Sequence, residues 1–402
     1  MDRDAILNWK VAKSGFPNRT INLRVAPDEE VRQQLVQGLN AGESLLLGGI
    51  MMGLQNAPNA GAINPEGMAD VMGVYFSIFE TVLKGLAQLD VGVAVSGGNI
   101  VVSDTVVPAP NSTLERWLAV NSNGVAPDVA AMDWSSTMAF AFSLRDDPAF
   151  SEILEKMMAA SMKLQNMSAE DMAVEESMKL MKEMLPMTVA MSMDFGKKGL
   201  GFGGHYRFPG RDGEQMRVRL KKFLDDSMSK QVGEGKPYSA FDYKEAVRKI
   251  DGSPVSRMTL AYNLQSPMFS APGQKEQIEA MFPGGKMTFE SVVVKDRMQF
   301  ASGGSLEDSM NAAKNAPPAG IKAGPRTIAI GQMNVLALMK QMFGAGGAAG
   351  SPLPAAVMDA LDPKGTAIRF RADLDGSLDG NLRIPLKLIS TISAAGKAAG
   401  NR

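Results

Sequence analysis

The sequence predicts an α+β protein in which repeated strand–helix–hairpin–helix modules build antiparallel sheets covered by long helices. Three observations support this fold class. Segments that read as strand, helix, hairpin and helix begin near Glu43, Thr137 and Arg326. Apolar and polar residues alternate in the hairpins, and Gly, Asn or Asp marks their turns. Between the hairpins, apolar residues recur at helical spacing.

Residues 1–133 are expected to hold a partial module and the first repeat. Ala5–Lys13 and Thr20–Val25 alternate around a turn, which predicts a hairpin. Pro27 then opens a helix, because its fixed φ suits the first helical turn. The first repeat follows as a strand, a helix, a hairpin and a helix capped by Asn111 or Ser112, at Ser44–Leu54, Pro65–Leu89, Val91–Val107 and Leu114–Leu118.

Residues 134–323 are expected to form the second repeat and an elaboration of it. The repeat has an alternating strand, a long Met-rich helical region, a hairpin and a helix, at Met138–Leu144, 146–186, Met187–Phe208 and Glu214–Met228. The elaboration consists of two hairpins, each followed by a helix, at Ala246–Leu264, Gln274–Phe282, Met287–Ala301 and Leu306–Lys314.

Residues 324–402 are expected to form the third repeat, which packs back on another unit. A strand is expected at Thr327–Met333 and a helix at Asn334–Phe343. A stretch rich in Gly, Ala and Pro follows at 344–354 and is typical of a linker. The hairpin Ala367–Ile384 and a final helix complete the repeat.

The composition excludes several classes of protein. The net charge is −1 and no basic patch stands out, so a nucleic-acid partner is not expected. The chain has no cysteine, which excludes disulfides and zinc–thiolate sites and fits an exported protein. No stretch reaches the roughly 18 consecutive apolar residues that predict a transmembrane helix. The incomplete opening module predicts a longer gene product with an upstream export signal.

Methionine is the strongest compositional feature, with 30 residues. Thioethers are soft ligands for Cu(I), whereas Met also packs in irregular cores and is common at adaptable binding surfaces. We interpret the main cluster as core packing and as an apolar binding surface, formed by Met178, Met181, Met184, Met187, Met191 and Met193. Cu(I) binding by the first four of these residues is the minor alternative.

Asp373, Asp375 and Asp379 resemble the start of a calcium-binding loop. Such a loop needs a bidentate Glu at its last position, where this chain has Ile384. Residues with a strand pattern flank the acidic stretch, so a polar hairpin turn is the other interpretation. The three carboxylates therefore stay as minor candidate metal ligands, and no cofactor is expected.

The only histidine, His205, follows a glycine-rich stretch at 199–204. Without a second His or a Cys, most nucleophile–histidine and transition-metal designs lack partners. The glycines also lack the Gly-Lys-Ser/Thr that a phosphate-binding loop requires. These residues predict an ordinary strand, and we expect that the protein is not an enzyme.

Two stretches share the order hairpin, proline and helix. Leu89–Pro110 leads into Ser112–Leu118, and Gly199–Pro209 leads into Glu214–Leu224. In this pattern the chain resembles uncharacterised exported bacterial proteins built from strand–helix–hairpin–helix repeats. The resemblance implies a periplasmic or cell-envelope location and a non-catalytic role. The lipid-anchoring cysteine of lipoprotein-like members is missing here.

The expected function is that of a non-enzymatic bacterial envelope or extracytoplasmic protein. It would bind an apolar small molecule, a lipid or a protein partner, because the modules are repeated, Met is abundant and catalytic groups are missing. The alternative function is a structural or assembly subunit of a larger complex, and the protein would then be an oligomer. The alternative location is the cytoplasm.

Overall fold

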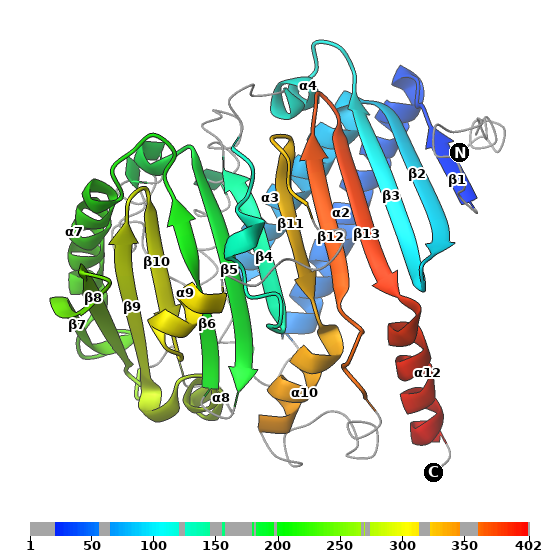
Figure 1. Ribbon diagram of the computed structural model, residues 1–402. Coiled ribbons are helices and arrows are strands. Elements are labelled where there is room, and N and C mark those ends of the chain that lie inside the picture. The colour runs from blue at the N-terminus through cyan, green and yellow to red at the C-terminus, as the bar shows by residue number, and fades with distance from the viewer. Residues whose placement is uncertain are drawn as a thin grey trace.

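The computed structural model describes residues 21–55, 65–119, 125–144, 155–156, 179–180, 182–196, 199–266, 269, 274–312, 322–345 and 361–400. Its strands are β1 (Ile21–Val25), β2 (Leu86–Ser96), β3 (Asn99–Pro108), β4 (Met138–Leu144), β5 (Met187–Gly196), β6 (Gly199–Arg207), β7 (Tyr238–Ile250), β8 (Ser253–Tyr262), β9 (Lys286–Val294), β10 (Arg297–Ser302), β11 (Thr327–Met333), β12 (Ile368–Leu374) and β13 (Leu378–Pro385). They form one sheet, in the order β1-β2-β3-β13-β12-β11-β4-β5-β6-β10-β9-β8-β7 (Figure 1).

The sheet extends outward from two central strands, β4 and β11, which pair antiparallel with Ala141 opposite Ile330. On one side β5, β6, β10 and β9 follow, and on the other side β12, β13, β3 and β2 follow. Each central strand therefore has two hairpins beside it. Beside β11, the hairpin β12–β13 comes from the C-terminal part of the chain and its neighbour β2–β3 from the N-terminal part. Between these two hairpins, Thr105 Oγ1 donates to Asp379 Oδ1 at 2.6 Å.

Short turns close the hairpins as their sequences predict. Asp251 and Gly252 have φ values of 48° and 84°, and this left-handed conformation suits a two-residue hairpin turn. Five predicted hairpins are confirmed, as β2–β3, β5–β6, β7–β8, β9–β10 and β12–β13. The predicted strands at 138–144 and 327–333 are confirmed as β4 and β11.

The helices are α2 (Glu29–Gln55), α3 (Pro65–Gly85), α4 (Thr113–Leu118), α7 (Gly213–Gln231), α8 (Gln274–Met281), α9 (Leu306–Ala312), α10 (Val335–Ala345) and α12 (Leu386–Gly400), with the 3₁₀ turns η2 (Val129–Ala131) and η4 (Pro283–Gly285). Figure 1 shows α2 and α3 behind one half of the sheet and α7 beside the other half. Ser112 caps α4, since its Oγ accepts from Glu115 N at 2.9 Å. This is one of the two predicted caps.

Apolar side chains pack on both faces of the central strands. On one face, Met187, Phe208 and Met298 pack with Met216 of α7. The opposite face carries a second cluster, in which Met132 and Trp134 lie with Ala139, Ala141, Ala190 and Ile330. Because strand side chains alternate between faces, the residues of β5 and β6 divide between these two clusters. The second cluster lies under the segment 125–137, which connects to β4.

The predicted arrangement of several sheets covered by long helices is wrong. The thirteen strands of the described residues join in a single antiparallel sheet, and helices lie against parts of it. The hairpins were predicted from local alternation, but local alternation carries no information about which hairpin edges pair. Here the outer strand of one hairpin pairs with the next hairpin, so the units share one sheet.

The strand predicted at Ser44–Leu54 is also wrong, because this stretch is the second half of α2. Its residues are mostly Leu, Met and Gly, without period-two alternation. Leu and Met are good helix formers, and no proline interrupts the helix that begins at Glu29. The apolar run therefore continues the preceding helix, and the first unit lacks the strand with which the other two units begin.

Some predicted features lie outside the described residues. They are the hairpin arm Ala5–Lys13, most of the Met-rich region 146–186, and most of the linker at 344–354. The partner arm of the first hairpin contributes β1, which pairs with β2. The third unit, residues 324–402, provides β11, β12 and β13 between β3 and β4. Within the described residues, no helix is both long enough and apolar enough to cross a membrane.

Candidate functional site

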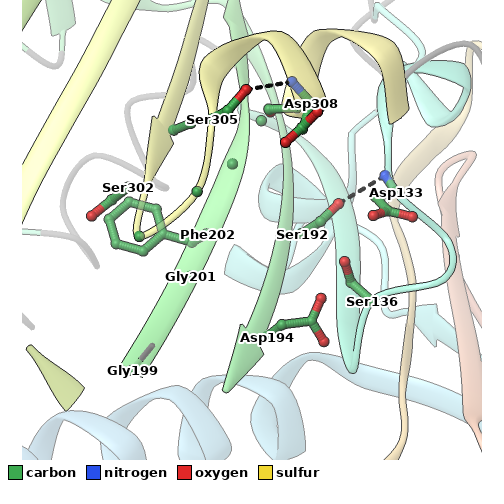
Figure 2. A pocket seen from close by; sticks show the side chains of 16 residues that line it. Asp133, Ser136, Ser192, Asp194, Gly199, Gly201, Phe202, Ser302, Ser305 and Asp308 are labelled. Atoms are coloured by element: carbon green, nitrogen blue, oxygen red, sulfur yellow. Dashed lines mark hydrogen bonds between the residues drawn. The ribbon is translucent and has the colours of Figure 1, made fainter. Parts of the chain in front are cut away.

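A hollow of about 460 Å³ opens beside β5 and β6 (Figure 2). Three parts of the chain line it: the segment before β4, the two strands, and the loop that leads from β10 into α9. Most of its lining residues are glycine, serine or aspartate. They are Asp133, Ser136, Ser192, Asp194, Gly199, Gly201, Phe202, Gly203, Gly204, Ala301, Ser302, Gly303, Gly304, Ser305, Asp308 and Ser309. The volume lies in the range of small-molecule sites.

Glycines on β6 form the floor of the hollow. Gly201 lies opposite Asp194 in the β5–β6 ladder, and Gly203 lies opposite Ser192. A Cβ at Gly203 would lie 2.5 Å from Ser309 Oγ, so the missing side chain lets α9 approach the sheet closely. A Cβ at Gly201 would meet no atom closer than 3.8 Å. The floor at Gly201 therefore has room for a methyl group, and it borders the hollow.

Two carboxylates on one wall are held by short hydrogen bonds on one oxygen only. Thr137 donates from both N and Oγ1 to Asp194 Oδ1, each at 2.7 Å. Ser135 donates from N at 2.9 Å and from Oγ at 2.6 Å to Asp133 Oδ1. Neither Oδ2 has a hydrogen bond to another described residue. Each carboxylate is thus fixed in place with one oxygen left to accept from a ligand.

Serine hydroxyls complete this wall. Ser192 Oγ accepts from Asp133 N at 2.8 Å, which ties the segment before β4 to β5. Ser136 is 8% exposed, and its hydroxyl has no hydrogen bond to another described residue. Figure 2 shows Ser136 and Asp194 among the residues that line the hollow. Ser136 lines the hollow, so its hydroxyl can donate to or accept from a bound group.

The opposite wall adds a third carboxylate, Asp308, at the first turn of α9. Its backbone N donates to Ser305 Oγ at 3.0 Å. None of the described lining residues is Lys, Arg or His, so the three carboxylates have no basic neighbour in the lining. The hollow is therefore negative and rich in acceptors, which favours a ligand with cationic donors. No group of three or more His, Cys, Asp or Glu side chains in the described part of the chain could hold a metal ion.

His205 does not line the hollow. It follows the glycine floor on β6 and is 0% exposed. Neither ring nitrogen has a hydrogen-bond partner among the described residues. The histidine is therefore a buried strand residue and cannot reach a molecule bound in the hollow.

The predicted methionine surface is only partly described. Met178 and Met181 lie outside the described side chains. Met187 is buried and Met184 packs against the same cluster, so both belong to the core beside α7. Met191 and Met193 are half-buried on β5. The four described methionines therefore do not form one exposed surface. Binding of an apolar molecule by all six methionines, and Cu(I) binding by the first four, stay predictions.

The three aspartates of the predicted calcium loop each have a different partner. Asp373 Oδ2 accepts from Arg371 Nε at 2.6 Å, and its Oδ1 accepts from Thr327 Oγ1 at 2.7 Å. Asp375 pairs with Arg326, and Asp379 accepts from Thr105. The stretch is the turn of the β12–β13 hairpin. Its carboxylates are thus used in ion pairs and cross-strand hydrogen bonds.

Sequence patterns missed the carboxylates of the hollow. Asp133, Asp194 and Asp308 belong to three separate parts of the chain, and only the pairing of β4, β5, β6 and β10 brings these parts together. The one available signal was the run of glycines before His205, which marks a close approach to a strand. Comparison of the chain with protein-family models, with curated proteins and with solved structures gives no match.

Proposed function

We propose that this protein is a non-enzymatic binding protein that holds a small organic cation in the glycine-floored hollow. The observation that carries the proposal is the lining itself: three carboxylates around a glycine floor, with no Lys, Arg or His among the described lining residues. An ammonium or guanidinium group donates several hydrogen bonds to carboxylate oxygens, and these charge-assisted bonds are the stronger class. Because the carboxylates stand on two walls, a molecule with two separated amino groups suits the hollow best.

The preformed wall supports binding over catalysis. Thr137 and Ser135 hold Asp194 and Asp133 in fixed positions, so binding would require little reordering of these side chains. Nucleophilic catalysis needs a base within hydrogen-bond reach of the nucleophile. The serines of the hollow have no such arrangement with His205, which is buried outside it.

Replacing one wall carboxylate is expected to weaken binding of an amine probe. Asp194→Asn keeps the shape of the side chain and removes its charge, so the affinity for spermidine should fall about tenfold or more, as for the loss of a charged hydrogen-bond partner. Isothermal titration calorimetry at pH 7.5 and low ionic strength measures this difference. Higher salt should also weaken binding to the parent protein, because screening reduces the attraction.

The matched control is Asp226→Asn on α7, which makes the same chemical change. The Asp226 side chain is 57% exposed and belongs to a surface pair with Lys222. This variant should bind spermidine like the parent. The neutral polyol inositol serves as a second probe. Inositol binding as tight as that of spermidine, or equal affinities for Asp194→Asn and the parent, would contradict the proposal.

A second candidate function is an assembly subunit, and exposed apolar side chains on α2 and α3 favour it. Leu45 is 79% exposed and Phe79 is 58% exposed, and Leu46 and Tyr75 are also exposed. We expect this surface to associate with a second copy of the chain, because burying it removes apolar area from water. Native mass spectrometry over a hundredfold concentration range should then show dimers, and Leu45→Asp should abolish them. A monomer at every concentration counts against this function.

An extracytoplasmic location remains part of the proposed function. It is supported by the absence of cysteine and by the resemblance of the hairpin–proline–helix stretches to exported bacterial proteins. Fractionation of cells that express the complete gene tests it. Recovery of the protein with cytoplasmic markers alone would contradict it.

A further inference from the structure

The only histidine lies in a cluster of charged groups next to the hollow. His205 Nε2 is 3.8 Å from Asp128 Oδ2, and the same oxygen is 2.6 Å from Arg297 Nη2. A second ion pair joins Arg207 of β6 to Asp296 in the turn before β10, with an Nε–Oδ2 distance of 2.9 Å. These are the charged groups that face the imidazole from the strands and from the segment packed on it.

The cluster contains three buried polar atoms without a hydrogen bond among the described residues. They are both ring nitrogens of His205 and Thr188 Oγ1, whereas Asp128 Oδ2 is held by its ion pair with Arg297. Thr188 lies opposite Arg207 in the β5–β6 ladder, two positions from the partner of His205, so it shares the face of the ring. A protonated imidazole has two N–H donors, and a buried charge with an unpartnered donor is costly. The packed arrangement therefore accommodates only the neutral ring.

Burial and the neighbouring charges also favour the neutral form of the His205 ring. Burial is the main cause that lowers the pKa of His205, to about 4, and the nearby Arg297 and Arg207 lower it as well. Asp128 and Asp296 oppose this effect without cancelling it. When the ring is exposed to water, it has its ordinary pKa of 6.5.

Asp128 belongs to the segment 125–137, which forms one wall of the hollow. The segment is held to the sheet by the Asp128–Arg297 pair, by the packing of Met132 and Trp134, and by the hydrogen bond from Asp133 N to Ser192. Asp133 and Ser136 lie further along the same segment and line the hollow. A movement that starts at Asp128 would therefore change the wall that carries these two residues.

We propose that His205, Asp128 and Arg297 form an acid-sensitive latch, in which protonation of His205 releases the segment 125–137 from the sheet. A buried imidazolium repels Arg297 and competes with it for Asp128, and water reaches both ring nitrogens once the segment moves. The consequence for ligand release rests on the proposed function, because it assumes that the hollow is the binding site. The latch itself does not depend on a ligand.

The direction of the pH dependence follows from the two protonation equilibria. Above pH 6.5 the ring is neutral in both states, and the latch stays closed. As the pH falls below this value, His205 becomes protonated in the open state, whereas in the closed state it becomes protonated only at about pH 4. The ratio of open to closed molecules should therefore rise about 80-fold between pH 6.5 and pH 4, and it approaches a total of about 300-fold only well below pH 4. Loss of the closed state on acidification is the signature of a base whose pKa is lowered by folding.

Trp134 provides a direct readout, because it lies in the segment and its Nε1 donates to Val129 O at 2.9 Å. The chain has two other tryptophans, so the full-length protein with Trp9→Phe and Trp117→Phe leaves Trp134 as the only one. We expect its emission to shift to the red and its acrylamide quenching to rise between pH 6.5 and 4. Far-UV circular dichroism should stay constant over this range, which separates a local opening from unfolding.

Two further measurements decide whether His205 is the cause. In the same background, His205→Gln removes the titrating group and should abolish the pH response of Trp134. Proton NMR of the single histidine in the parent chain gives its pKa directly, and this measurement needs no variant. The latch would be overturned if His205→Gln left the response of Trp134 unchanged, or if the histidine titrated near pH 6.5 in the closed protein. It would also be overturned if Trp134 became exposed only as the circular dichroism signal was lost. Spermidine binding plays no part in these readouts, so a failure of the ligand proposal would be seen separately.

Discussion

Phe300→Ala is expected to lower the free energy of unfolding by about 3–5 kcal/mol, the usual cost of truncating a fully buried phenylalanine. Phe300 is on β10 and is 1% exposed. Its ring centroid lies 5.0 Å from that of Tyr206 and 5.5 Å from that of Phe289. The substitution removes these ring contacts and leaves a cavity on the sheet face opposite the segment 125–137. Urea denaturation at pH 7.5, followed by circular dichroism, measures the loss.

The matched control is Phe79→Ala on α3, which deletes the same side chain from an exposed position, measured at a protein concentration at which native mass spectrometry shows only the monomer. Its effect should stay within about 0.5 kcal/mol, as for other surface substitutions. If both variants lose the same free energy, the ring cluster around Phe300 does not contribute to the core as the structure indicates. A change in the slope of unfolding against urea would point instead to an altered unfolded state.

Hairpins could be predicted from the sequence because their determinants are local. Alternation with period two identifies the two arms, and residues such as Asp251 and Gly252 identify the turn. The pairing of β13 with β3 has no such local determinant. It joins residues from opposite ends of the chain, such as Asn381 and Ser103, and each strand would look the same with another neighbour. Strand order was therefore beyond the reach of the local patterns.

The helix α2 shows how an apolar run can be misread. Ser44–Leu54 is apolar over a strand-like length, but it lacks the alternation that distinguishes a half-buried strand. Its continuity with the helix that starts at Glu29 was the better guide. Leu45 ends up exposed there, and local apolar character alone did not predict the environment of this residue.

The candidate site was predictable only in one of its parts. The glycines before His205 were visible as a group, and a bend or a close approach was their expected role in a strand. The carboxylates had no signal, because Asp194 lies within an ordinary strand, Asp308 lies in a short helix and Asp133 lies in the segment before β4. These three side chains come together only because of the order of the strands in the sheet, and the local sequence patterns did not predict that order.

Two glycines on β6 have different roles: Gly204 allows the close pairing of β6 with β5, and Gly201 borders the hollow. A Cβ at Gly204 would lie 2.0 Å from Ala190 O and 2.9 Å from Met191 Cα, both backbone atoms of the paired strand β5. These atoms cannot move without breaking the β5–β6 ladder. Gly204→Ala is therefore expected to lower the free energy of unfolding by at least about 3 kcal/mol, at the upper end of the usual cost of overpacking. Thermal and urea unfolding measure this loss.

Gly201→Ala is the matched substitution three residues earlier on the same strand. Its Cβ would meet Asp194 O and Ser302 O at 3.8 Å and Gly303 C at 3.9 Å, so it fits without displacing the backbone. Stability should stay the same or rise by about 0.5 kcal/mol, because alanine loses less conformational entropy than glycine on folding. The new methyl group would stand on the same face as Asp194 and occupy part of the floor. Gly201→Ala should therefore weaken spermidine binding in a fully folded protein, and unchanged binding would place the ligand elsewhere.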